Sequence, residues 1–119
     1  MYSPQLLDHF QNPRHGGDVP NADATAELEN PVCGDVLRVT LRVRGDQISE
    51  VRFKAKGCVP VMACGSALTE LVWGKTTQQA QDLQVEDVIA AVGGVPQAST
   101  HAAQLAIDTL VAALRQIKA

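Results

Sequence analysis

The first 29 residues predict a helix and a strand joined by an irregular connection. Ser3 is a good N-cap and Pro4 a good first helical residue, so a short helix is predicted to run to about Gln11. Residues 14–23 contain glycine and proline and predict an irregular connection. Residues 24–29 predict a first strand.

Apolar and polar residues then alternate strictly. Residues 37–44 place leucine or valine at every second position, with arginine or threonine between them, which is typical of a half-buried strand. Gly45-Asp46 supplies a turn, and residues 47–55 return with a similar alternation. The two segments therefore predict an antiparallel hairpin.

After the second of these strands, the apolar period changes from two residues to about 3.6. A helix with Pro60 in its first turn is predicted to end at Trp73, and two further helices are predicted at residues 85–92 and 99–118. The predicted fold class is α+β: a three-stranded antiparallel sheet covered on one face by helices, in one domain spanning residues 1–119.

Composition determines what can fill the core. A chain of 119 residues with 45% apolar content can build a single core without disulfides or metals as staples. Aromatic residues make up only 3%, so the core must consist of Val, Leu, Ile and Ala. Phe10, Phe53 and Trp73 are its few large side chains in this prediction.

The net charge of -3 argues against a nucleic-acid partner, because phosphate neutralisation needs clustered Lys and Arg. Basic residues do gather in the predicted hairpin, but they alternate with apolar ones. This pattern predicts the solvated face of a sheet, with a docking surface for an acidic protein partner as the alternative. The residues concerned are Arg38, Arg42, Arg44, Arg52, Lys54 and Lys56.

Neither a membrane span nor a signal peptide is visible. No apolar run approaches the roughly 20 residues that a span requires, and residues 1–9 lack the basic and apolar blocks of a signal peptide. We therefore expect a cytoplasmic protein with no membrane partner. Three cysteines in a reducing compartment favour thiol chemistry or metal binding over a disulfide framework.

Four residues are candidates for that chemistry. Cys33 and Asp35 flank Gly34, and residues two apart in an extended chain point the same way. Cys58 lies where a strand gives way to a helix, and the unpaired N–H groups there favour a thiolate. His101 lies in the first turn of the last helix, where a neutral imidazole is a suitable nitrogen ligand.

Each candidate also has a structural interpretation. A lone cysteine is often a small buried hydrophobe, Asp35 can cap a turn, and His101 can serve as a polar residue at a helix start. Cys64 shares a helix face with Ala67 and Leu68, and we expect it in the core rather than at a metal.

Local sequence strings carry a resemblance to a known family. In order along the chain they are Asp8-His9-Phe10-Gln11-Asn12-Pro13-Arg14, Cys33-Gly34-Asp35, Arg52-Phe53-Lys54, Gly57-Cys58, Thr69-Glu70 and Gly74-Lys75-Thr76. Over nearly its whole length the chain resembles the NifU-like or IscU-like iron-sulfur cluster assembly scaffolds. The resemblance implies the same α+β fold as the patterns predict.

The resemblance also implies a site. Cys33, Asp35 and Cys58 match the family's first cysteine, its aspartate and its second cysteine, and His101 matches the histidine before the third cysteine. Ala102 stands where that third cysteine is expected. The remaining two thiolates, imidazole and carboxylate form a complete tetrahedral set for Zn²⁺, and a more labile [2Fe-2S] cluster is also compatible with them.

As a function, the resemblance implies a scaffold or carrier that is not an enzyme. It would bind a cluster or zinc, accept sulfur from a cysteine desulfurase and serve apo iron-sulfur acceptor proteins, as a monomer or a cluster-bridged dimer. The alternative is a zinc-bound sulfur acceptor or desulfurase regulator that no longer builds clusters. An enzyme with a Cys33 or Cys58 nucleophile activated by His101 is disfavoured, because no third orienting group accompanies the pair.

Overall fold

The three predicted strands form one antiparallel sheet in the computed structural model, which describes residues 2–31 and 34–117. The strands β1 (Ala24–Asn30), β2 (Asp35–Arg44) and β3 (Gln47–Lys56) are neighbours in that order. β2 pairs with both of its neighbours, and a register shift interrupts its pairing with β3 after Arg42.

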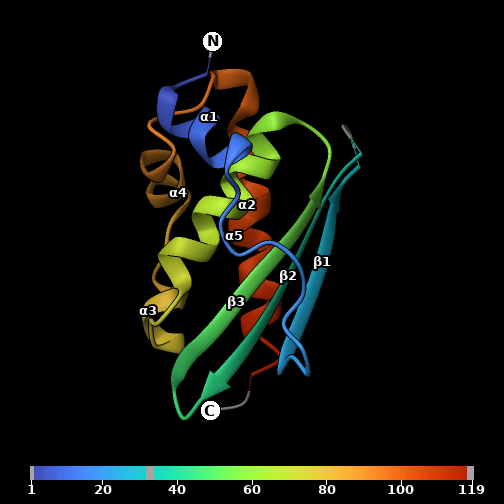
Figure 1. The fold of residues 1–119 in the computed structure, drawn as a ribbon, viewed down its shortest axis with the longest axis vertical. Helices are drawn as coiled ribbons and strands as arrows, with labels where there is room; N and C mark the ends of the chain where they lie inside the picture. The colour runs from blue at the N-terminus through green and yellow to red at the C-terminus, as the bar shows by residue number, and fades with distance from the viewer. Residues whose placement is uncertain (1, 32–33, 118–119) are drawn as a thin grey trace.

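Helices cover one face of this sheet (Figure 1). They are α1 (Pro4–Gln11), α2 (Val59–Val72), α3 (Thr77–Gln81), α4 (Val85–Ala91) and α5 (Thr100–Leu114), with a 3-10 helix, η1 (Gln97–Ser99), leading into α5. α2 and α5 lie directly on the sheet. The predicted α+β fold, with helices on one face of a three-stranded sheet, is therefore confirmed.

The core lies between the sheet and these helices. Alternate strand residues such as Leu37, Val39 and Leu41 are fully buried beneath the helices. At Gly65 the helix α2 comes so close to the sheet that an added Cβ would lie 2.7 Å from the Phe53 ring. This glycine explains how a helix can pack so closely over the largest side chain of the core.

The structure differs from the sequence predictions in one helix and in the burial of one aromatic residue. The short helix α3 was not predicted, because its sequence Thr-Gln-Gln-Ala-Gln offers a single buried residue, Ala80, and no apolar stripe. Its start is instead fixed by a capping box between Thr76 and Gln79.

Trp73 was expected in the core, but it is 38% exposed and its ring stacks on His15, with the centroids 4.2 Å apart.

Residues 12–23 run from α2 along the outer edge of β3 and then onto the opposite face of the sheet. The Gly17 amide donates to the Phe53 carbonyl, and the Val19 amide donates to Thr40 Oγ1, which buries Thr40 at the centre of this face. The irregular connection predicted from glycine and proline therefore has a packing role.

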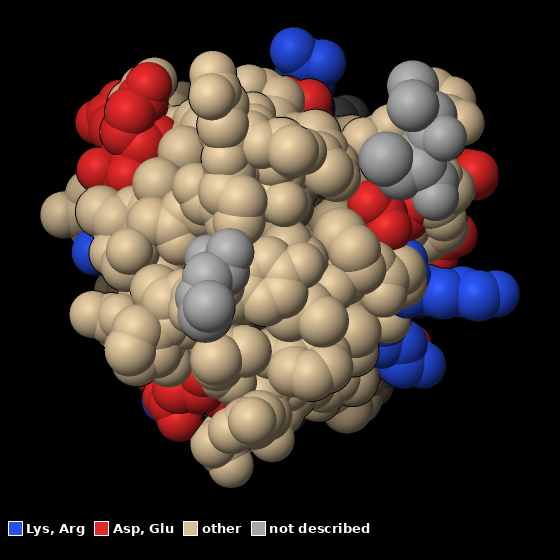
Figure 2. Space-filling model, turned by 90° about the horizontal axis from the view of Figure 1, so that it is seen from above, with Lys and Arg blue, Asp and Glu red and all other residues tan. Residues whose placement is uncertain are grey.

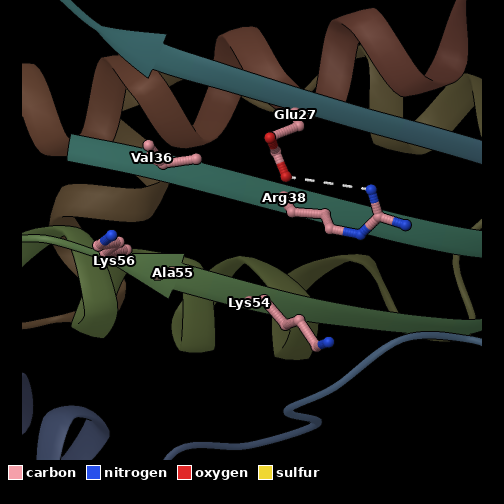
Figure 3. Close-up of a pocket in the computed structure, with 6 residues that line it drawn as sticks. All are labelled: Glu27, Val36, Arg38, Lys54, Ala55 and Lys56. Carbon is pink, nitrogen blue, oxygen red and sulfur yellow. Dashed lines mark ion pairs between the residues drawn. The ribbon is translucent and has the colours of Figure 1, made fainter. Parts of the chain in front are cut away.

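The basic residues of the hairpin lie on this outer face, as their alternation predicts. Arg38 and Lys54 share the carboxylate of Asp18, at 2.9 and 3.2 Å, and Arg38 also lies 4.0 Å from Glu27 (Figure 3). Val36 and Lys56, which are paired with each other, lie beside them on the same surface (Figure 3). Acidic neighbours thus offset much of the positive charge, which agrees with a solvated face. Among the described residues, no helix is long and apolar enough to cross a membrane.

Candidate metal centre

Three chain segments meet at the upper end of the molecule in Figure 1. Asp35 is the first residue of β2, Cys58 is the N-cap of α2, and His101 is the second residue of α5. One potential ligand atom from each lies within 4.8 Å of the other two. The structure therefore brings three of the four predicted site residues together, while Cys33 lies outside the described residues.

Asp35 is held by the main chain of the neighbouring turn. Its side chain is only 4% exposed, and its Oδ1 atom accepts a hydrogen bond from the Cys58 amide at 3.0 Å. Its Oδ2 atom lies 3.6 Å from Cys58 Sγ and 3.4 Å from His101 Nε2. One carboxylate oxygen thus orients the side chain, and the other faces the sulfur of Cys58 and Nε2 of His101.

Gly57 makes this arrangement possible. Its φ of 138° lies in the region that favours glycine, and a Cβ at this position would lie 2.0 Å from Asp35 Oδ1. The glycine was noted in the sequence only as part of a family string. Its steric role depends on the approach of β2, which the local sequence does not reveal.

Cys58 is half-buried, and its surroundings act in opposite directions on the pKa of its thiol. Burial raises the pKa of Cys58 above its ordinary value, and the Asp35 carboxylate raises the pKa further. The Val61 amide acts in the opposite direction but does not outweigh burial. The N–H groups at the helix start therefore act in the predicted direction but are outweighed by burial, so metal binding at this thiol must displace a proton.

Of the two ring nitrogens of His101, one has a hydrogen-bond partner among the described residues and the other has none. Its Nδ1 atom lies 3.2 Å from the Ala98 carbonyl oxygen. Its Nε2 atom is buried and has no hydrogen-bond partner among the described residues. Such an atom normally costs free energy, so its position beside a thiol and a carboxylate fits a bound cation.

The remaining thiol is not part of this group. Cys64 lies in α2 with no exposed surface, and burial raises its pKa to about 12. The prediction that Cys64 belongs to the core is confirmed. Ala102, which follows His101 in α5, is also buried, with 1% of its surface exposed.

Residues that were not predicted from the sequence also line the site. Tyr2, Pro60 and Ser99 line the same hollow as Asp35, Cys58 and His101. Figure 2, which views this end of the molecule, shows a mostly uncharged surface with the charged side chains at its margins. No motif marks these residues, because their proximity arises only when three segments converge.

Fold and site together define a small α+β domain with a thiol, a carboxylate and an imidazole gathered at one end of its sheet. Comparison with known families identifies it further. The model of the NifU-like N terminal domain matches residues 1–119. The chain belongs to this family, which confirms the resemblance read from the local strings.

Its relatives include proteins named as scaffolds. The chain is 38% identical over 110 residues to iron-sulfur cluster assembly scaffold protein IscU 1 of Archaeoglobus fulgidus, covering 92% of this chain and 72% of the relative. It is 34% identical over 121 residues to IscU of Escherichia coli K12, covering 98% and 94%. A NifU-like N-terminal structure from Brucella abortus shares the fold, with a TM-score of 0.77 at 21% identity over 97% and 92% of the two chains.

Proposed function

We propose that this protein is an iron-sulfur cluster assembly scaffold or carrier, rather than an enzyme, and that Cys33, Asp35, Cys58 and His101 hold its cargo. The observation that carries the proposal is the convergence of Asp35, Cys58 and His101, with a buried, unsatisfied Nε2 atom facing the other two donors. Family membership supports the same function, because the relatives named above are cluster assembly scaffolds.

The cargo is a [2Fe-2S] cluster or Zn²⁺. Thiolate and imidazole suit both, and a carboxylate completes a tetrahedral set for zinc. Mixed thiolate and nitrogen ligation of a two-iron cluster also has precedent in proteins. Oxygen ligation should make such a cluster more labile, which suits a protein that passes its cargo to apo iron-sulfur acceptor proteins.

Sulfur would come from a cysteine desulfurase. A thiolate of Cys33 or Cys58 attacks the outer sulfur of a persulfide on the desulfurase. One S–S bond forms on the scaffold as the original S–S bond breaks, and the desulfurase cysteine leaves as a thiolate. Ala102 cannot take this role. We further propose that the protein works in the cytoplasm, as a monomer or as a dimer bridged by its cluster.

A second function is favoured by one observation. Ala102 contributes no sulfur beside His101, and Cys64 is buried in the core, so the site has at most two thiolates. That set suits zinc well. The alternative is therefore a zinc-bound sulfur acceptor or desulfurase regulator that does not build clusters.

The metal and acid-labile sulfide content of protein purified without oxygen, together with its visible spectrum, tests the proposal. A scaffold should contain iron and sulfide in equal amounts and absorb in the visible range. The alternative predicts one zinc per chain, no sulfide and no colour. Protein that retains neither metal nor cluster, even after reconstitution with iron and sulfide, would contradict both functions.

Substitutions assign the site residues. Cys33→Ala and Cys58→Ala should each abolish stoichiometric metal binding, and His101→Ala should weaken it by about 10-fold or more, because each removes a ligand. Cys64→Ser is the matched control, since it also removes a thiol and should leave the stoichiometry unchanged. Loss of metal from Cys64→Ser would show that this buried thiol is a ligand.

A further inference from the structure

The two ring nitrogens of His101 lie in different surroundings. Nδ1 lies 3.2 Å from the carbonyl oxygen of Ala98, in the 3-10 helix η1. Nε2 is buried near Asp35 and Cys58, 3.4 Å from Asp35 Oδ2, but without hydrogen-bond geometry to any described residue. The ring therefore has one nitrogen tied to the main chain and one directed at the site.

A backbone carbonyl can only accept a hydrogen bond, so the nitrogen that contacts it must carry the proton. We propose that η1 holds the neutral His101 ring in its Nδ1–H tautomer, which leaves the Nε2 lone pair free for a cation. Neutral histidine in water favours the opposite tautomer, with the proton on Nε2. The turn thus opposes the intrinsic preference of the ring.

Pro96 positions the turn η1 that carries the Ala98 carbonyl. The Ser99 amide donates to the Pro96 carbonyl at 2.7 Å, and Thr100 Oγ1 donates to the Gln97 carbonyl at 3.2 Å. Pro96 has a φ of -57°, which its ring fixes, and it precedes the turn directly. It restrains the segment that carries the Ala98 carbonyl, although it is not among the residues that line the site.

The same principle applies to the second oriented ligand. Asp35 Oδ1 accepts the Cys58 amide, just as the Ala98 carbonyl accepts from Nδ1 of His101. Main-chain groups of two turns therefore orient both side chains, a role that other side chains often play around metal sites. The purpose of the arrangement rests on the proposed function, whereas the tautomer itself is a property of the metal-free protein.

The tautomer can be measured directly. In protein labelled with ¹⁵N-histidine, stripped of metal and held at pH 8, a long-range ¹H–¹⁵N correlation spectrum reports which ring nitrogen carries the proton. We expect His101 to be at least about 80% in the Nδ1–H form. A spectrum dominated by the Nε2–H form, or by a doubly protonated ring, would overturn the proposal even if the protein binds a cluster.

A variant pair tests the role of Pro96. Pro96→Gly should lower the Nδ1–H fraction of His101 and weaken Co²⁺ binding by about 10-fold, within the range seen for groups that orient ligands. Pro20→Gly, in the exposed connection before β1, is the matched control and should change neither quantity. An unchanged His101 tautomer in folded Pro96→Gly would remove Pro96 from the proposal, and the wild-type spectrum tests the tautomer independently of how the variant folds.

Discussion

At the scale of single residues, the contact between Gly57 and Asp35 is the tightest constraint on the site. An alanine at position 57 would place its Cβ 2.0 Å from Asp35 Oδ1 at a φ of 138°. Gly57→Ala should therefore displace the carboxylate, lower the free energy of unfolding by about 2 kcal/mol or more, and weaken Co²⁺ binding. Denaturant unfolding and a Co²⁺ titration measure the two effects.

Gly74→Ala separates the clash from backbone strain. Gly74 has a φ of 82°, but an added Cβ would meet no described atom within 4 Å. This variant should lose about 1 kcal/mol through strain alone and keep its Co²⁺ affinity. Equal loss of affinity in both variants would contradict the steric role assigned to Gly57.

The buried thiol of Cys64 supports a second prediction at this scale. Alkylation requires a thiolate, and burial both raises the Cys64 pKa to about 12 and shields the sulfur. In folded protein at pH 8, iodoacetamide should modify Cys64 at least about 100-fold more slowly than in urea. Peptide mass spectrometry measures both rates. Modification of folded Cys64 before the half-buried Cys58 would refute its placement in the core.

At the scale of elements, α1 is tied to α2 through a buried polar contact. His9 Nδ1 lies 2.8 Å from Ser66 Oγ, and the same hydroxyl accepts the Arg14 amide at 2.9 Å. Glu70 lies 3.4 Å from His9 Nε2. Burial lowers the His9 pKa, and the positive charge of Arg14 lowers it further, while Glu70 only partly offsets them. The neutral ring is therefore the form that fits between the two helices.

This contact gives the stability a pH dependence. Because the folded-state pKa of His9 lies below its ordinary value of 6.5, the unfolded chain binds more protons as the pH falls through that value. The contribution of His9 is thus fully present above about pH 7.5 and decreases below about pH 6.5. Urea unfolding at pH 8 and pH 5.5 should show lower stability at pH 5.5.

His9→Asn is the matched variant, because it keeps an acceptor near Ser66 but does not titrate. Its free energy of unfolding should change less between pH 8 and pH 5.5 than that of the wild type. Asp8 and Asp18, whose pKa values are lowered chiefly by hydrogen bonds from Arg14 and Arg38, respond at lower pH and do not interfere. An equal decrease in both proteins would exclude His9 as the source.

At the scale of the whole molecule, the sheet was predictable because its pattern is local. Alternation over residues 37–55 specifies two strands and their buried face without knowledge of the rest of the chain. The helix α3 and the exposed position of Trp73 were not predictable in this way. The first depends on a cap rather than on apolar periodicity, and the second on where the end of α2 lies relative to residues 12–17.

The site was predictable only in its residue types. Asp35 and Cys58 are 23 residues apart, and no spacing rule places them in one pocket with His101. Local context marked each residue as a candidate, the family resemblance grouped them into one site, and the fold shows that three segments bring Asp35, Cys58 and His101 together. The roles of Gly57 and the Ala98 carbonyl arise from close approach of main chain and side chain, which a sequence does not encode locally.

The most direct test of the account is X-ray absorption at the zinc edge of metal-free protein loaded with one equivalent of Zn²⁺. The account predicts a mixed shell, with sulfur at about 2.3 Å and nitrogen or oxygen at about 2.0–2.1 Å, and no stoichiometric zinc binding by Cys58→Ala. A shell of nitrogen and oxygen alone would contradict it, because the metal would then lie away from the end of the sheet where Asp35, Cys58 and His101 meet.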